Sequence, residues 1–136
     1  MGARFLVDSN AIIELLAGQL PPATNAWLND AVARRLVAYS VINRIEVLSW
    51  PEANLADMQA ATEWLAANQE LPLSNLVAVS TINLRRSYRR KLPDAVIAAT
   101  ALVHQLPVIT RDGAGFRAIA GLVVFDPHDP AALPAL

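Results

Sequence analysis

Short hydrophobic runs alternate along the chain with longer segments in which apolar residues recur at helical spacing. Runs bounded by polar residues, glycine or proline predict strands. The predicted strands are Arg4–Val7, Leu36–Tyr39, Leu71–Leu73, Pro107–Ile109 and Leu122–Phe125. The amphipathic segments predict helices. The predicted helices are Ala11–Ala17, Ala23–Arg35, Val41–Trp50, Leu55–Asn68, Asn75–Lys91, Pro93–Gln105 and Gly113–Ile119.

This alternation of strands and helices predicts one three-layer α/β/α domain over residues 1–136, built around a central, mainly parallel five-stranded sheet. The Pro93–Gln105 helix is apolar on nearly every side, so we expect it to be buried. In such sheets ligands bind beyond the carboxyl ends of the strands. Candidate chemistry should therefore lie where the predicted strands end.

The composition excludes several classes of protein and of chemical site for this chain. Hydrophobic residues make up 54% of the chain and charged residues 17%, which excludes intrinsic disorder. The absence of cysteine excludes disulfides, thiolate nucleophiles and zinc–sulfur sites. No apolar run approaches the ~18 residues of a membrane span, and Asp8 interrupts the N-terminal segment early. We therefore expect a cytoplasmic protein with no membrane contact.

Four acidic residues occupy the positions that this topology favours. Asp8 and Asp112 follow predicted strands, Asp94 opens the buried helix, and Glu46 lies in the helix after the second strand. Carboxylates that converge on one cleft cannot all ionise without a cation. Oxygen ligands without cysteine or a well-placed histidine favour Mg²⁺ or Mn²⁺, which can activate water against a phosphodiester.

Each acid also has a structural interpretation. Asp8 and Asp112 can cap the helices that follow them, and Asp94 suits the positive end of a helix dipole. Glu46 is harder to explain in this way. On a helical wheel it falls between Ile42 and Trp50, so we expect it to face the interior without a local cation.

A basic stretch precedes Asp94. The net charge is −1, yet five of the eleven basic residues lie between positions 85 and 91. Arg85, Arg86, Arg89 and Arg90 form like-charged i,i+4 pairs if the helix continues through them, and a phosphate backbone would relieve that repulsion. Tyr88 would then offer a stacking surface. The alternative is a solvated helix end whose cations face the negative pole of the dipole.

The ordered set of motifs resembles the PIN-domain ribonucleases, in particular the VapC-type toxins of bacterial toxin–antitoxin systems. The resemblance covers essentially the whole chain. Its motifs are Phe5–Asn10 (FLVDSN), Ser40–Leu48 (SVINRIEVL), Leu92–Ala101 (LPDAVIAATA), Val108–Asp112 (VITRD) with Phe116, and Val124–Pro127 (VFDP).

The resemblance implies a compact α/β domain that cleaves RNA with Mg²⁺ or Mn²⁺. It makes Asp8, Glu46 and Asp94 the core catalytic and metal-binding acids and Asp112 the fourth. Ser9 and Thr110 would be nearby polar contacts to the substrate. The resemblance also implies a homodimer and a cognate antitoxin that blocks the cleft and helps to bind operator DNA. Asn43 stands where threonine is frequent in relatives, a change expected to matter little for metal binding.

Two other functions are compatible with parts of this pattern. A haloacid-dehalogenase-like phosphatase also begins with an aspartate after its first strand, but it needs a second aspartate where this chain has Asn10. It also needs a later lysine, and Lys91 is the only lysine in the sequence. A non-catalytic PIN-like module would bind RNA or a protein without cleavage. Substitution of Asp94 distinguishes this module from an enzyme.

Overall fold

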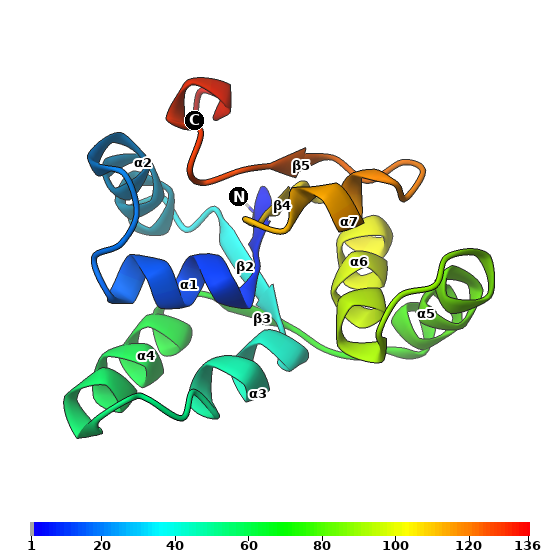
Figure 1. Cartoon of the computed structure of the whole chain (residues 1–136), viewed down its shortest axis with the longest axis horizontal. Helices are drawn as coiled ribbons and strands as arrows, with labels where there is room; N and C mark the ends of the chain where they lie inside the picture. The colour runs from blue at the N-terminus through cyan, green and yellow to red at the C-terminus, as the bar shows by residue number, and fades with distance from the viewer. Residues whose placement is uncertain (1) are drawn as a thin grey trace.

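The computed structural model describes residues 2–136 and contains a five-stranded, wholly parallel sheet between helices (Figure 1). The strands are β1 (Phe5–Val7), β2 (Val37–Ser40), β3 (Gln69–Leu71), β4 (Val108–Ile109) and β5 (Val124–Phe125). The helices are α1 (Ser9–Leu16), α2 (Pro22–Ala33), α3 (Val41–Leu48), α4 (Leu55–Ala67), α5 (Asn75–Ser87), α6 (Leu92–His104) and α7 (Gly113–Arg117), with a 3₁₀ turn at Pro130–Ala132. The predicted α/β/α architecture is confirmed.

The strand order β3-β2-β1-β4-β5 places β1 at the centre of the sheet. Alternation along β1 divides the core into two layers. Phe5 and Val7 pack with residues of α1, α2 and α4, whereas Leu6 packs with residues of α5, α6 and α7. Figure 1 shows α1 and α4 on one side of the sheet and α5 and α6 on the other.

Helix α6 is the most deeply buried helix of the second layer. All seven residues from Ala95 to Ala101 are buried, as its nearly continuous apolar sequence predicts. The alanines allow a close approach to the sheet, and α5 packs against the other side of the helix. This packing fixes the N-terminus of α6, and therefore Asp94 in its first turn.

The predicted elements begin and end within two residues of the observed ones, except at the end of α5, and the differences at β3 and α5 have clear causes. Strand β3 covers Gln69–Leu71 rather than Leu71–Leu73, because the exposed residues Gln69 and Glu70 pair with β2 at the edge of the sheet. Pro72 follows the strand and has no N–H to donate to the ladder. Helix α5 ends at Ser87 instead of continuing to Lys91, since Tyr88 is already extended (φ −128°, ψ 139°).

The C-terminal segment is fastened to the first helical layer. The buried Thr24 hydroxyl donates to the Pro127 carbonyl (2.6 Å), and the Trp27 indole N–H donates to the Pro134 carbonyl (2.7 Å). His128 pairs with Glu14 of α1. Within residues 2–136, no helix combines the length and apolarity required to cross a bilayer.

Candidate active site

The parallel register brings the ends of β1, β2 and β4 to one edge of the sheet. Val7 pairs with Ile109, and the Asp8 backbone N–H continues this ladder by donating to the Ile109 carbonyl (2.9 Å). Asp8 and Thr110 therefore follow neighbouring strands side by side. Asp8 is also the N-cap of α1, since its Oδ1 accepts from the Ser9 N–H (2.8 Å). Its capping and its site position are thus compatible.

Neutral donors surround the buried carboxylate of Asp8, which is only 6% exposed. Its Oδ1 accepts from the Asn43 side-chain amide (3.1 Å) as well as from the Ser9 N–H. Its Oδ2 accepts from the Thr110 hydroxyl (2.9 Å) and lies 3.5 Å from the Asn10 amide nitrogen. No ion pair reaches Asp8 within the described part of the chain.

This environment raises the pKa of Asp8 from 3.8 to about 6. Burial is the main cause, because it penalises the ionised form. The negative charges of Glu46 and Asp94 raise the pKa further, whereas the hydrogen bonds from Ser9 and Thr110 lower it. The protein therefore brings the Glu46 and Asp94 carboxylates within electrostatic reach of Asp8 and leaves this buried carboxylate without a compensating cation.

Glu46 reaches the site from α3, but it does not face the interior as expected. Glu46 is exposed, while Asn43 and Val47 form the buried stripe of the short helix. The buried stripe of α3 runs through Asn43, whose side chain belongs to the capping box, and Val47, so Glu46 lies at the rim of this stripe. There Glu46 Oε1 accepts a 2.6 Å hydrogen bond from the Ser9 hydroxyl, which joins it to the Asp8 end of α1.

Asp94 and Asp112 occupy less buried positions. Asp94 is half-buried in the first turn of α6 and lies close enough to influence Asp8. Asp112 is exposed, and its backbone N–H donates to the Thr110 hydroxyl (3.1 Å) while its side chain makes no capping hydrogen bond to α7. The structure thus joins Glu46 to the Asp8 end of α1 through Ser9, places Asp94 within electrostatic reach of Asp8, and joins the backbone of Asp112 to Asp8 through Thr110.

The donor set suits a hard divalent cation, although the acids do not already form a closed cage. Within residues 2–136, no three acidic or histidine side chains lie close enough together to hold a metal. Mg²⁺ does not require such a cage, since it keeps several waters and is usually bound through one or two carboxylates. A buried, unpaired Asp8 beside two further carboxylates fits an ion of this kind.

The basic stretch forms a groove of about 710 Å³ just before α6. Its lining comprises Thr81, Ile82, Arg85, Arg86, Arg89, Arg90, Lys91 and Leu92. Because α5 ends at Ser87, Arg89 and Arg90 are not on the helix and the expected i,i+4 repulsion does not arise. The Arg90 guanidinium packs over the Phe116 ring at 5.9 Å.

Tyr88 does not provide the expected stacking surface. It packs against the second core layer, and its hydroxyl accepts a hydrogen bond from the Ala120 N–H (3.1 Å). This anchoring explains why the chain leaves the helix at Tyr88. The exposed cations Arg85, Arg86 and Arg89 remain for contact with a polyanion.

Sequence reasoning did not assign roles to Asn10 and Asn43. The Asn10 amide donates to the Thr110 hydroxyl (3.2 Å), and its carbonyl oxygen accepts from the Arg111 N–H (3.2 Å). Asn43 is fully buried and donates to both Asp8 and Ser9. The only signal in the sequence was a polar residue three positions after the Ser40 cap, which is also what an ordinary capping box requires.

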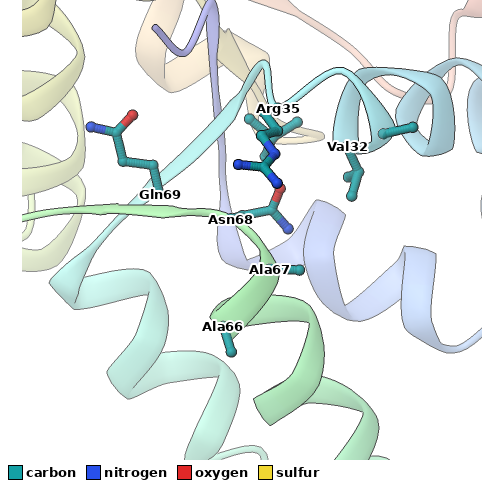
Figure 2. A pocket seen from close by; sticks show the side chains of 8 residues that line it. Val32, Arg35, Ala66, Ala67, Asn68 and Gln69 are labelled. Atoms are coloured by element: carbon teal, nitrogen blue, oxygen red, sulfur yellow. The ribbon is translucent and has the colours of Figure 1, made fainter.

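A second cavity, of about 630 Å³, lies at the end of α2 and the start of β3 (Figure 2). Its lining contains no acidic residue and includes Arg35, Asn68 and Gln69. Arg35 has a positive φ of 58° because it closes α2, with hydrogen bonds from Arg35 N–H to Val32 O and from Leu36 N–H to Ala31 O. This conformation is explained by helix termination, so the cavity gives no sign of chemistry.

Comparison with known families and structures adds to this geometry. The family model "PIN domain" matches residues 5–122. No curated protein matches the sequence. A chain from a toxin–antitoxin complex of Klebsiella pneumoniae is 30% identical, with a TM-score of 0.73 over 90% of this chain and 97% of that chain.

Two further solved structures are similar over nearly the same extent. A chain of FitAcB from Neisseria gonorrhoeae is 28% identical, with a TM-score of 0.70 over 90% of this chain and 97% of its own. A chain of DNA-bound VapBC from Salmonella typhimurium is 21% identical and shows the shared fold, with a TM-score of 0.79 over 92% of this chain and 98% of its own.

Proposed function

Because this chain belongs to the PIN-domain family, we propose that it is a VapC-type toxin that hydrolyses RNA phosphodiester bonds with Mg²⁺ or Mn²⁺. The observation that supports this function best is the buried Asp8 carboxylate. It has no cationic partner among residues 2–136 and lies within the influence of Glu46 and Asp94. Such a site is costly unless a cation joins it.

Each acid has a defined part in the proposed reaction. Asp8, Glu46 and Asp94 would hold the cation, and Asp112 would contribute from the adjacent loop. When bound, the cation lowers the pKa of a water molecule and stabilises charge on the phosphoryl group. Ser9 and Thr110 fix the carboxylates of Glu46 and Asp8 through hydrogen bonds of 2.6 and 2.9 Å.

The basic groove would bind the RNA backbone next to these acids. Arg85, Arg86 and Arg89 are exposed, and the groove leads directly to Leu92 at the start of the helix that carries Asp94. Arg90 would act from a fixed position, because it packs on Phe116. Contacts with phosphates supply affinity without sequence preference.

The proposed partners follow from the similar solved complexes. We infer a cognate antitoxin that covers the acidic cleft, as well as a homodimer of this chain. Contact with operator DNA would be made through the antitoxin. The similar solved structures include a toxin–antitoxin complex from Klebsiella pneumoniae and DNA-bound VapBC from Salmonella typhimurium.

Asn10 supports nuclease chemistry over a haloacid-dehalogenase-like phosphatase. That phosphatase needs a carboxylic acid two residues after the first aspartate to transfer a proton. Here an amide occupies the position and donates to the Thr110 hydroxyl at 3.2 Å. An amide does not titrate in this way, so the residue serves to orient its neighbours.

The decisive experiment compares the wild-type chain with Asp94→Asn on single-stranded RNA, with Mg²⁺, with Mn²⁺ and with EDTA. We expect cleavage only with the cations and a loss of about 100-fold or more in the variant. Asp30→Asn is the matched control, because Asp30 is an exposed carboxylate that pairs with Arg34 on α2. Cleavage that persists in EDTA would contradict the metal assignment. RNA binding without cleavage by the wild type would indicate the non-catalytic module.

A further inference from the structure

We infer that Asn43 is a positioning residue that orients the carboxylates of Asp8 and Glu46 together for a divalent cation. The inference rests on the proposed function and deepens it. Asn43 is fully buried in the first turn of α3, and its side-chain amide contacts both the start of that helix and the start of α1. It touches no exposed surface through which substrate could reach it.

The capping box fixes the direction of the Asn43 amide. Its Oδ1 accepts the Ser40 backbone N–H at 2.8 Å, and its own backbone N–H donates to the Ser40 hydroxyl at 3.2 Å. A flipped amide would place its NH₂ group against the Ser40 N–H and lose this bond. The Nδ2 group must therefore point away from Ser40, toward Asp8 and Ser9.

The two protons on Nδ2 then have two separate acceptors. One is Asp8 Oδ1 at 3.1 Å, and the other is Ser9 Oγ at 2.9 Å. Since Ser9 Oγ accepts a hydrogen bond from Asn43, its own O–H is free to donate to Glu46 Oε1, which lies 2.6 Å away. A single side chain thus sets the direction of the hydrogen bonds that reach two of the acids.

This arrangement leaves the two oxygens of Asp8 in different situations. Oδ1 accepts two hydrogen bonds, from the Ser9 N–H and from Asn43. Oδ2 accepts one short bond from Thr110, and its contact with Asn10 is long at 3.5 Å. Asn43 therefore holds the plane of the carboxylate by Oδ1 and leaves Oδ2 as the oxygen with spare capacity for a cation.

Titration with Mn²⁺ tests this role by electron paramagnetic resonance, which measures free Mn²⁺ and does not depend on turnover. Asn43→Ala removes both donors, so we expect affinity for Mn²⁺ to fall about 10-fold, at the lower end of the effect of outer-sphere partners of metal sites. Asp8→Asn is included to establish that binding occurs at this site.

Ser40→Ala is the matched control. It removes the hydroxyl that caps α3, yet it keeps the backbone N–H that orients the Asn43 amide. Both variants therefore weaken the same capping box, but only Asn43→Ala removes the donors to Asp8 and Ser9. We expect both to lose thermal stability and only Asn43→Ala to lose affinity for Mn²⁺. Equal affinities in the two variants would overturn the inference.

A measurement on the unmodified side chain covers the case in which Asn43→Ala fails to fold. The two side-chain amide protons of Asn43 give their own signals in ¹H–¹⁵N correlation spectra. We expect these signals to shift on titration with Mg²⁺ in the wild type and to stay in place in Asp8→Asn. Signals that do not respond to saturating Mg²⁺ would overturn the inference.

The failures of the two proposals are distinguishable. If the wild type binds Mn²⁺ and Asp8→Asn does not, the metal site stands, and only the comparison of Asn43→Ala with Ser40→Ala decides the role of Asn43. If the wild type does not bind Mn²⁺, or binds it equally well after Asp8→Asn, the metal site is wrong and the role of Asn43 falls with it.

Discussion

Two carboxylates on or beside α1, Asp8 and Glu14, are buried to the same extent in opposite surroundings. Each is 6% exposed. Glu14 has a basic side chain on each oxygen, since its Oε2 lies 2.6 Å from His128 Nε2 and its Oε1 lies 3.5 Å from Arg111 Nη1. Asp8 receives hydrogen bonds from neutral groups and has other carboxylates nearby.

The difference separates a structural carboxylate from one that needs a partner outside the chain. The fold itself supplies Glu14 with the Arg111 guanidinium and the His128 ring, so its burial joins α1 to the C-terminal segment and to the loop after β4. The fold supplies only orientation to Asp8. Burial by itself would therefore have ranked the two acids equally, and the sign of their neighbours distinguishes them.

The largest expected effect is the pH dependence of stability that Asp8 causes in the metal-free protein. Its pKa is about 6 in the folded state, against 3.8 for an ordinary aspartate such as that of the unfolded chain, so the folded state holds the proton more tightly. The stabilisation is complete below pH 4 and is lost as the pH rises through 6, by up to about 3 kcal/mol. Urea unfolding in EDTA at pH 4 and pH 7 measures it.

Asp8→Asn is the control for this titration, because other groups contribute to the total pH dependence. The difference between the pH dependence of the wild type and that of the variant isolates Asp8. In the wild type, the loss of stability at pH 7 should be smaller when saturating Mg²⁺ is added. If the free energies of unfolding of wild type and variant change in parallel between pH 4 and pH 7, Asp8 contributes nothing to the pH dependence. The contrast between Asp8 and Glu14 would then be wrong.

The second prediction concerns Glu14→Ala, which removes the carboxylate that pairs with Arg111 and His128. Arg111 and His128 are 60% and 36% exposed in their side chains, so water can solvate them after the loss. We expect a decrease of about 2 kcal/mol in the free energy of unfolding at pH 7. Glu63→Ala, at an exposed position of α4, should cost little. A Glu14 variant as stable as the Glu63 variant would show that the contacts of Glu14 with Arg111 and His128 contribute nothing to stability.

The third prediction extends the comparison to cations. Arg111 pairs with Glu14, whereas Arg85 and Arg86 form no ion pair in the described residues. In an Asp94→Asn background, the double variant Arg85→Ala/Arg86→Ala should lower the slope of log affinity for RNA against log salt by about 1.4. Binding at increasing KCl concentrations measures this slope.

Arg34→Ala/Arg35→Ala is the matched control for the loss of two charges. These arginines are adjacent at the end of α2, and Arg35 lines the cavity of Figure 2 rather than the basic groove. Their removal should leave the salt dependence unchanged. An equal change in both double variants would indicate a general effect of net charge and return Arg85 and Arg86 to the role of solvated surface residues.

The sequence predicted the fold well because its hydrophobic pattern is locally unambiguous. The run from Ala95 to Ala101 is apolar at every position except Thr100, and this helix is buried. Strand β3 was placed two residues too late, because Gln69 and Glu70 are polar and are held by pairing with Tyr39 and its neighbours at the edge of the sheet. Pairing of this kind depends on tertiary contacts and leaves no hydrophobic pattern.

The site was predicted less completely than the fold, for a different reason. The topology places Asp8 and Thr110 at the ends of adjacent strands, and this could be deduced from the order of the elements. The orientation of Glu46 could not, because the helical wheel carries no information about the capping box that turns Asn43 inward. Tyr88 was misinterpreted as well, since its contact with Ala120 joins segments distant in the sequence.

The bond between Thr24 and Pro127 has a practical consequence for anyone who shortens or tags this protein. A chain that stopped at Phe125 would leave the Thr24 hydroxyl buried without its acceptor and would deprive Trp27 and Glu14 of Pro134 and His128. The last eleven residues therefore belong to the minimal folding unit, and a purification handle should follow them rather than replace them.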